Sequence, residues 1–475
     1  MGTKIVIEPV SRVEGHGKVA VYLNERGHVD KAQLHITQVR GFEKFCEGRL
    51  FNEMLVITPR ICGICPVSHH LAAAKACDEI LNVQLTPTAE MLRRLLHYAQ
   101  LVQSHALHFF YLASPDLLFG MESDPASRNI IGVIAAQPEL ARKGVALRAF
   151  GQKIIEYLGE KRVHPNAAIP GGMNKALAQS ERELIAGQID RVIADSLLAV
   201  NLVKDYITKN KALVDSFASF ESSYMGLVDK NNNVEYYDGK LMLKDTNGIV
   251  LEDKFDPKDY LNYIEEKVED WSYLKFPYYK KFGYPNGMYR VGPLGRFNAA
   301  EGHSTPLANY EFQEARKMAK NGILQGSLYY HLVRMIEMLN AAEQIKILVQ
   351  NELICGKDIW VNSGIVNQEG VGVIEAPRGT LIHHYKVDKS GKIQKVNLIV
   401  STGHNNLAMN RSVFDVAREY IKDGKVTEGV LNRIEVAIRC YDPCFSCSTH
   451  ALGHMPLELT IHEADGSVRE VLSQQ

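Results

Sequence analysis

Two pairs of cysteines with the spacing of metal ligands lie near opposite ends of this chain. Cys62 and Cys65 form one pair, and Cys444 and Cys447 form the other. A gap of two residues lets both sulfurs of a pair reach one ion. Four thiolates favour zinc, an iron–sulfur cluster or another soft metal over magnesium or calcium. The spacing therefore predicts a four-thiolate metal site, which forms only if the two ends of the fold meet.

The wide separation of the two pairs leaves the kind of site open. Zinc-ribbon pairs lie about 15–20 residues apart, whereas most of the chain separates Cys65 from Cys444. On spacing alone, the pairs could form a structural zinc site or a thioredoxin-like dithiol, or they could be unrelated. A histidine follows each pair, at His69 and His450. Because a histidine N–H can orient a metal-bound thiolate, these residues favour a metal site.

The composition is that of an ordinary globular protein. The chain has 475 residues, of which 46% are hydrophobic and 23% charged, and its formal net charge is −1. The balanced charge gives no electrostatic reason to bind nucleic acid or an anionic membrane. The apolar run 130–136 is too short to span a bilayer, and the first residues form no secretory signal. We therefore expect a cytoplasmic protein whose cysteines are thiols or metal ligands.

Long helices and short strands must position these cysteines. Alternating apolar residues predict strands within 3–38 and a hairpin in the C-terminal tail. Residues 371–402 are expected to form a second β region, with a turn at Asp388 to Gly391. Thr86 and Pro87 have the residue types of a helix N-cap and first turn. Apolar stripes at three- and four-residue spacing predict long helices over three segments: 87–109, 180–217 and 307–352.

The expected fold is therefore α+β and mainly α, with long central helices and small peripheral sheets. An irregular stretch at 222–300 contains Asn-rich and Gly-containing turns, which predict small strands and loops inserted between the helices. We expect residues 1–450 to form one large domain and residues 451–475 to form an extension.

The two cysteine motifs resemble the paired signatures of the nickel–iron hydrogenase large subunit. They read RICGICPVSH at 60–69 and DPCFSCSTH at 442–450. Within the family, WSYLKFPYYK at 271–280 and VGPLGRFN at 291–298 look like the cytoplasmic, NAD-coupled bidirectional group. Four further segments extend the resemblance over essentially the whole chain: SRVEGHGKV (11–19), RGFEKFCEGR (40–49), EAPRGTLIHHY (375–385) and NNLAMN (405–410).

The resemblance implies a nickel–iron centre, with nickel held by four thiolates and with CO and cyanide on the iron. By motif position, Cys62 and Cys444 are the terminal nickel ligands, and Cys65 and Cys447 bridge nickel to iron. Heterolysis of H₂ needs a Lewis acid for the hydride and a nearby base for the proton. The Cys444 thiolate is the expected base, and Glu14 matches the glutamate that relays the proton.

Further residues match the surroundings of that centre. Arg378 matches the arginine over the open metal position, and Asp442 matches the acidic residue before the second cysteine pair. Two positions depart from the family pattern, because Ser401 replaces a frequent proline and Ser104 replaces an acidic residue. The resemblance assigns four residues to the cofactor's surroundings, of which the last three line the pocket around the diatomic ligands: His69, Pro377, Ser401 and Thr402.

A second ion and a processed tail are also implied. Glu43, His450 and the Leu398 carbonyl resemble the ligands of a buried magnesium, and a carboxylate and a carbonyl suit that hard ion. Family members are cut after the histidine of the second motif by a specific endopeptidase. The corresponding extension here is 451–475, which either is removed on maturation or stays as an edge hairpin.

The chain has no spare set of cysteines for an electron relay and no complete GxGxxG or P-loop motif. We therefore expect two kinds of partner: an iron–sulfur small subunit, together with NAD(P)-binding flavin and iron–sulfur diaphorase subunits. The predicted function is reversible cleavage of H₂, with electrons passed to NAD(P) and, in a bifurcating complex, also to ferredoxin. The alternatives are a deazaflavin- or heterodisulfide-linked hydrogenase, a zinc-stabilised scaffold, and a subunit like those at the quinone site of respiratory NADH dehydrogenase, which lack the cysteines.

Overall fold

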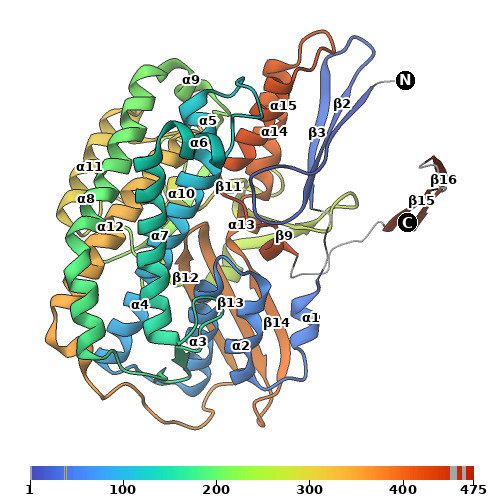
Figure 1. Cartoon of the computed structure of the whole chain (residues 1–475). Coiled ribbons are helices and arrows are strands. Elements are labelled where there is room, and N and C mark those ends of the chain that lie inside the picture. The colour runs from blue at the N-terminus through green and yellow to red at the C-terminus, as the bar shows by residue number, and fades with distance from the viewer. Residues whose placement is uncertain (1–2, 37, 39, 450–456, 463–466, 475) are drawn as a thin grey trace.

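A bundle of long helices forms the main body of the computed structural model (Figure 1), which describes residues 3–36, 38, 40–449, 457–462 and 467–474. Helices α4 (Pro87–Leu107) and α12 (Tyr329–Gln350) pack against each other and are buried along most of their length. Helices α7 (Pro138–Gly159) and α8 (Gln179–Lys209) pack on them from outside. The buried side chains of α8 recur at three- and four-residue spacing, which is typical of a helix with one face on the core.

The predicted start of the α4 helix is confirmed. The Thr86 side chain accepts a hydrogen bond from Ala89 N, and Pro87 occupies the first helical position, where its missing N–H costs nothing. The helix continues into a π-helical turn, η3 (His108–Ala113).

The predicted helix over 307–352 is two helices. Helix α11 (Pro306–Lys317) ends well before α12 begins at Tyr329. Asn321 and Gly322 between them have φ values of +57° and +75°, which no α-helix accommodates. The apolar residues between the two helices are buried although they are not helical. The apolar spacing in the sequence therefore continues through the break and does not reveal it.

Small antiparallel β-sheets lie outside the helical bundle. Strands β1 (Lys4–Ile7), β2 (Gly17–Leu23) and β3 (Val29–Ile36) form the N-terminal sheet, which lies beside α14 (Asn406–Tyr420) and α15 (Glu428–Arg439) (Figure 1). Strands β12 (Glu369–Ala376), β13 (Gly379–Val387) and β14 (Ile393–Ile399) form a second sheet, whose first strand packs on α3 (Pro66–Leu81). Strands β15 (Leu457–His462) and β16 (Val468–Gln474) form the predicted C-terminal hairpin. These positions confirm the predicted strand regions.

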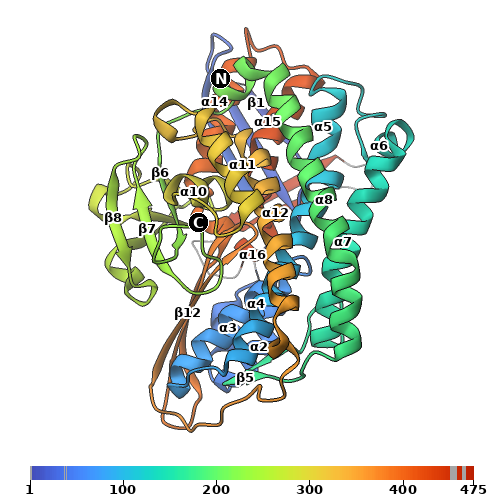
Figure 2. The same cartoon turned by 90° about the vertical axis from the view of Figure 1, so that its left-hand side faces the viewer.

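The segment predicted as an irregular insertion contains small sheets. Figure 2 shows it on the side of the molecule opposite α7. Its four-stranded sheet has the order β11-β6-β7-β8, and β11 runs parallel to β6. Its apolar core includes Val373, Ile382 and Ile399 of the β12–β14 sheet. The strands are β6 (Ser223–Val228), β7 (Lys240–Lys244), β8 (Val250–Phe255), β9 (Ile264–Val268), β10 (Lys275–Tyr279) and β11 (Tyr289–Arg290).

The two ends of the described fold meet near the cysteines. Glu14 and Cys444 form a parallel β-bridge, and Phe445 N donates to Glu14 O at 3.0 Å. Gly15 allows this approach because its φ is +85° and a Cβ there would lie 2.8 Å from the Phe445 Cβ. The remaining short elements are α1 (Phe42–Cys46), α2 (Met54–Ile57), α5 (Ser114–Phe119), α6 (Ile130–Ala136), α9 (Lys211–Ser216), α10 (Pro293–Ala299), α13 (Ser401–His404), α16 (Phe445–Ser448), β4 (Ala168–Ile169), β5 (Gly172–Met173) and the 3₁₀ turns η1 (Phe51–Glu53), η2 (Thr58–Ile61), η4 (Pro257–Asn262), η5 (Lys280–Phe282), η6 (Lys320–Gly322) and η7 (Glu352–Cys355).

Among the described residues, no helix has the length and apolar composition that crossing a bilayer requires.

Candidate metal centre

The four cysteines of the two motifs gather in one buried group. Cys62 ends η2, Cys65 caps α3, and Cys444 caps α16, so short turns aim the sulfurs inward. The Sγ atoms of Cys62 and Cys444 are 3.1 Å apart, and those of Cys65 and Cys447 are 3.4 Å apart. All four sulfurs lie within 4.8 Å of one another, and none forms a disulfide. The group has the ligand set and compactness of a soft-metal centre.

The electrostatics of this group also fit a bound cation. Burial raises the pKa of the Cys444 and Cys447 thiols well above the ordinary value. Hydrogen bonds, first of all from Cys444, lower the pKa of Cys62 well below it. The protein itself therefore stabilises one thiolate but not four. A multivalent metal ion would supply the missing positive charge.

Glu14 lies against the terminal cysteine of the second motif. The Cys444 thiol donates to Glu14 Oε2 at 2.9 Å, and Ser446 N donates to the same oxygen at 3.0 Å. Cys444 is fully buried, whereas Glu14 is half-buried. The single carboxylate of Glu14 therefore lies between the buried Cys444 sulfur and the protein surface.

Arg378 and Asp442 form a buried ion pair beside the sulfurs. Arg378 donates through Nε to Asp442 O at 2.6 Å and through Nη2 to Asp442 Oδ1 at 3.0 Å. Its Nη1 lies 3.3 Å from the Oγ of Ser104, the position where the sequence departs from the family pattern. Burial raises the pKa of Asp442 to about 6, and the positive charge of Arg378 opposes this rise. The pair fixes the guanidinium with three of its donors occupied.

A small cavity adjoins three of the four sulfurs. The Ser401 hydroxyl donates to Gly379 O at 2.7 Å, and Thr402 Oγ1 accepts from Cys444 N at 2.9 Å. The buried hydroxyl of Ser68, which the sequence did not single out, has no hydrogen-bond partner there. The cavity lining is Cys65, Ser68, His69, Ala376, Pro377, Arg378, Leu381, Val400, Ser401, Thr402, Cys444 and Cys447.

A chain of aromatic side chains leads away from Cys447. His69 Nε2 lies 3.5 Å from Cys447 Sγ, and His69 Nδ1 lies 3.1 Å from His383 Nε2. His383 Nδ1 in turn lies 2.6 Å from the hydroxyl of Tyr385. The sequence pointed to His69 but not to the other two. Their signal is weak, since alternate residues of a buried strand are normally core.

The predicted magnesium ligands are only partly described. Leu398 N donates to Glu43 Oε1 at 2.8 Å. Lys275 Nζ lies 3.5 Å from Glu43 Oε2 and 3.4 Å from Glu266 Oε2. Burial raises the pKa of Glu266 to about 7. His450 lies outside the described residues, so the magnesium site stays a prediction.

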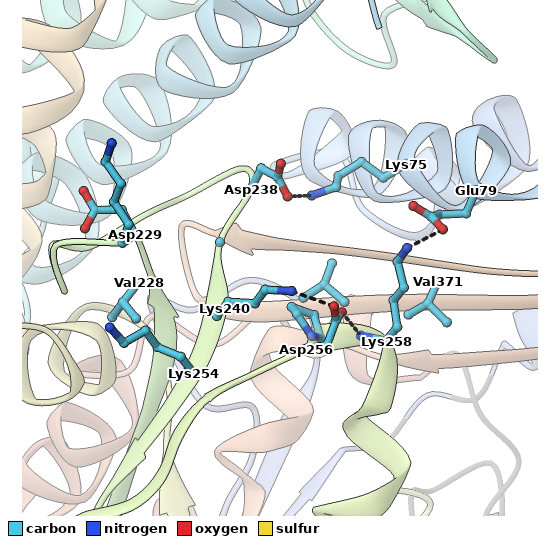
Figure 3. A pocket seen from close by; sticks show the side chains of 14 residues that line it. Lys75, Glu79, Val228, Asp229, Asp238, Lys240, Lys254, Asp256, Lys258 and Val371 are labelled. Carbon is cyan, nitrogen blue, oxygen red and sulfur yellow. Dashed lines mark hydrogen bonds and ion pairs between the residues drawn. The ribbon is translucent and has the colours of Figure 1, made fainter. Parts of the chain in front are cut away.

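A wide hollow elsewhere carries opposed charges (Figure 3). It lies between α3 and the inserted strands, and none of the predicted site residues lines it. Lysines and carboxylates pair across it: Lys258 with Glu79 at 2.6 Å and Lys240 with Asp256 at 2.6 Å. These pairs compensate the local charge, so we assign the hollow no chemistry.

Comparisons with known proteins agree with this geometry. The family model of the nickel-dependent hydrogenase matches residues 40–127 and 202–450, and a model described as HoxL-like matches residues 4–39. The chain is 45% identical to the NAD-reducing hydrogenase HoxS subunit beta of Cupriavidus necator, over 98% of each chain. It is 43% identical to one subunit of the F420-non-reducing hydrogenase vhc of Methanococcus voltae, again over 98% of each.

A solved structure extends the agreement to the fold. The crystal structure of an NAD⁺-reducing [NiFe]-hydrogenase in its H₂-reduced state superposes with a TM-score of 0.92 at 46% identity, covering 94% of this chain and 99% of that one. A [NiFeSe]-hydrogenase from Dm. baculatum superposes with a TM-score of 0.75 at 21% identity, covering 95% of this chain and 100% of that one. The predicted fold class is confirmed.

Proposed function

This chain belongs to the nickel-dependent hydrogenase family, and we propose that it is the catalytic subunit of an NAD-linked nickel–iron hydrogenase. It catalyses the reversible cleavage of H₂ into protons and electrons. The observation that carries the proposal is the buried group of four sulfurs within 4.8 Å, with Glu14 and Arg378 at its edge. A structural zinc site would leave this combination unexplained, because it needs neither a proton-accepting carboxylate nor an adjoining cavity.

The four sulfurs divide into two kinds of ligand in this proposal. Cys62 and Cys444 would be terminal ligands of nickel, and Cys65 and Cys447 would bridge nickel to an iron carrying CO and cyanide. The cavity adjoins both proposed bridging cysteines, Cys65 and Cys447, together with Cys444. Small ligands of the iron would therefore have space beside the proposed bridging pair. The unpartnered Ser68 hydroxyl could donate a hydrogen bond to such a ligand.

When bound, the nickel–iron centre supplies the Lewis acid and the electron acceptor that heterolysis of H₂ requires. The protein supplies the base. Cys444 Sγ accepts the proton and passes it over 2.9 Å to Glu14 Oε2, a distance typical of direct transfer. Ser446 N–H holds the receiving oxygen in place. Arg378 offsets the negative charge of the thiolates and, held by Asp442, keeps a fixed orientation while it does so.

Electrons leave the chain through partner subunits. Among the described residues, the four cysteines are the one group of side chains placed to hold a metal ion, which leaves no second centre for a relay there. We propose that the direct partner is an iron–sulfur small subunit, with NAD(P)-binding flavin and iron–sulfur diaphorase subunits beyond it. The likeness to the NAD-reducing enzyme of Cupriavidus necator supports this acceptor. In a bifurcating assembly, ferredoxin is reduced as well.

Three further proposals accompany this function. Glu43, the Leu398 carbonyl and His450 bind magnesium. A maturation endopeptidase removes residues 451–475 from the domain formed by 1–450 once the metal is loaded. The complex works in the cytoplasm, a reducing compartment that suits a chain with eight free cysteines.

H₂-dependent reduction of NAD⁺, NADP⁺ and a deazaflavin by the purified complex tests the proposed acceptor. Reduction of a nicotinamide cofactor with no reduction of the deazaflavin is expected. The Cys444→Ser variant serves as the inactive control, because serine is a poor ligand for a soft metal. Reduction of the deazaflavin alone would refute the NAD link, and full activity of Cys444→Ser would refute the metal assignment.

A further inference from the structure

Arg296 of the VGPLGRFN segment is fully buried and uses all five of its donors. Its Nε and Nη2 donate to the two carboxylate oxygens of Glu337, each at 2.6 Å. Its Nη1 donates to Glu375 Oε2 at 2.7 Å. The remaining N–H groups reach two main-chain carbonyls, Ala376 O at 3.0 Å and Pro377 O at 3.2 Å. A guanidinium has five N–H groups, so every one of them has an acceptor here.

The two carbonyls belong to the residues immediately before Arg378. They lie at the turn between β12 and β13, where Pro377 and Arg378 line the cavity beside the sulfurs. Glu375 also accepts from Thr380 Oγ1 at 2.8 Å, so the same carboxylate holds the other end of the turn. Arg296 therefore bonds the main chain of this turn, whereas the Arg378 side chain bonds Asp442.

The same segment touches the turn at a second point. Gly292 has φ +82°, and a Cβ at this position would lie 2.8 Å from the Arg378 carbonyl oxygen. A carbon that close would force the carbonyl to move. Gly292, the N-cap of α10, and Arg296, in its last turn, thus approach Arg378 and its two predecessors from one element.

A gain in folding stability is a poor explanation for a buried ionic group of this kind. One guanidinium faces two carboxylates with no exposed surface, and replacing such groups with apolar residues is often neutral or stabilising. The charged groups instead form rigid, bidentate hydrogen bonds, which hold a backbone in one position. The backbone fixed here is the one that carries Arg378.

We propose that Arg296 is a positioning residue for H₂ turnover, which holds Pro377 and Arg378 at the metal pocket through the carbonyls of residues 376 and 377. The inference rests on the proposed function, since Arg378 matters only if a metal centre occupies the pocket. A displacement of about 1 Å of a catalytic group can lower a rate about 100-fold. The expected effect is therefore on turnover per bound nickel and on the surroundings of the iron's ligands.

The test compares two buried arginines in the purified complex. Arg296→Lys keeps the charge but cannot reach both carboxylates and both carbonyls with one ammonium group. Arg290→Lys is the matched control, because Arg290 is equally buried and bonds Ser222, Phe220 O and Gln325 O, away from the turn. We expect Arg296→Lys to lower turnover per nickel at least tenfold and to shift the infrared bands of CO and cyanide. Arg290→Lys should leave both unchanged.

A pair of glycine variants tests the same turn if Arg296→Lys does not fold. Gly292→Ala presses on the Arg378 carbonyl, whereas Gly248→Ala has the same φ of +82° and meets only the Ile323 side chain at 3.5 Å. Gly292→Ala should reproduce the infrared shift and the loss of turnover, and Gly248→Ala should not. Unchanged turnover and bands in Gly292→Ala or Arg296→Lys, or equal changes in the controls, would overturn the inference. A parent complex without nickel would instead overturn the proposed function itself.

Discussion

Replacement of Glu14 by glutamine should separate proton transfer from metal binding. The glutamine side chain keeps the length of glutamate and can still accept from Ser446 N, which now lies 3.0 Å from Oε2. It cannot take up the proton of the Cys444 thiol, whose sulfur lies 2.9 Å from the same oxygen. A positioned acid or base contributes about 10²–10⁴-fold to a rate, or about 3–5 kcal/mol of activation free energy. We therefore expect H₂ oxidation by Glu14→Gln to fall at least 100-fold with nickel and iron retained.

The assay is H₂-dependent dye reduction, measured with D₂/H⁺ exchange and with metal content on the same preparation. Both activities should fall together, since both need the proton to leave the cysteine. Glu8→Gln is the control, because Glu8 directly follows β1, is exposed and lies 3.9 Å from Lys18. Turnover of Glu14→Gln within twofold of the parent at full metal content would refute the relay. Loss of nickel would show instead that Glu14 has a structural role.

Three further predictions concern the pocket and the buried core. Arg378→Lys should lower turnover at least tenfold at unchanged nickel content, because a lysine cannot keep both bonds to Asp442. The cyanide infrared bands should shift in the same variant, and turnover equal to that of the parent would contradict the prediction. Thr402→Val should lower the free energy of unfolding by about 1–3 kcal/mol, because it leaves Cys444 N without its acceptor; denaturant titration measures this, and an unchanged midpoint would contradict it. The free energy of unfolding should also fall on acidification. Burial lowers the pKa of several histidines below 6.5, so the unfolded chain binds more protons than the folded chain between pH 6.5 and the lowered pKa. Three such groups together should remove about 3 kcal/mol between pH 6.5 and 5.5, and equal unfolding free energies at those two pH values would contradict the prediction. Their lowered pKa values are about 4 for His70 and about 3 for His97 and His404.

Strong local signals in the sequence predicted the elements well. The helix that begins at Pro87 followed from a cap and a periodic apolar stripe, which act within a few residues. The strands of 371–402 were predicted as a second β region with a turn at Asp388 to Gly391, and the antiparallel pairing of β13 with β14 confirms them. The break between α11 and α12 did not follow, because Asn321 and Gly322 interrupt a pattern that the buried apolar residues continue.

For the site, too, the sequence predicted what depends on neighbouring residues but not what depends on contacts between distant elements. The cysteine pairs and their flanking residues carried enough information to identify the ligand set. His383 and Arg296 were missed as parts of the site, because their contacts join elements far apart in the chain. Ser68 was missed although it lies within the first cysteine motif. Arg296 lies on α10 but bonds residues of α12 and of the β12–β13 turn. No local pattern marks such a residue as different from an ordinary buried arginine.

Metal stoichiometry of the natively purified complex decides between nickel and zinc at the four cysteines. Nickel, iron and zinc should be measured together by mass spectrometry, with iron corrected for the clusters of the partner subunits. We expect about one nickel per chain at the four cysteines, and loss of that nickel in Cys444→Ser. Zinc at one per chain with no nickel would contradict it and would reduce the four thiolates to a structural site.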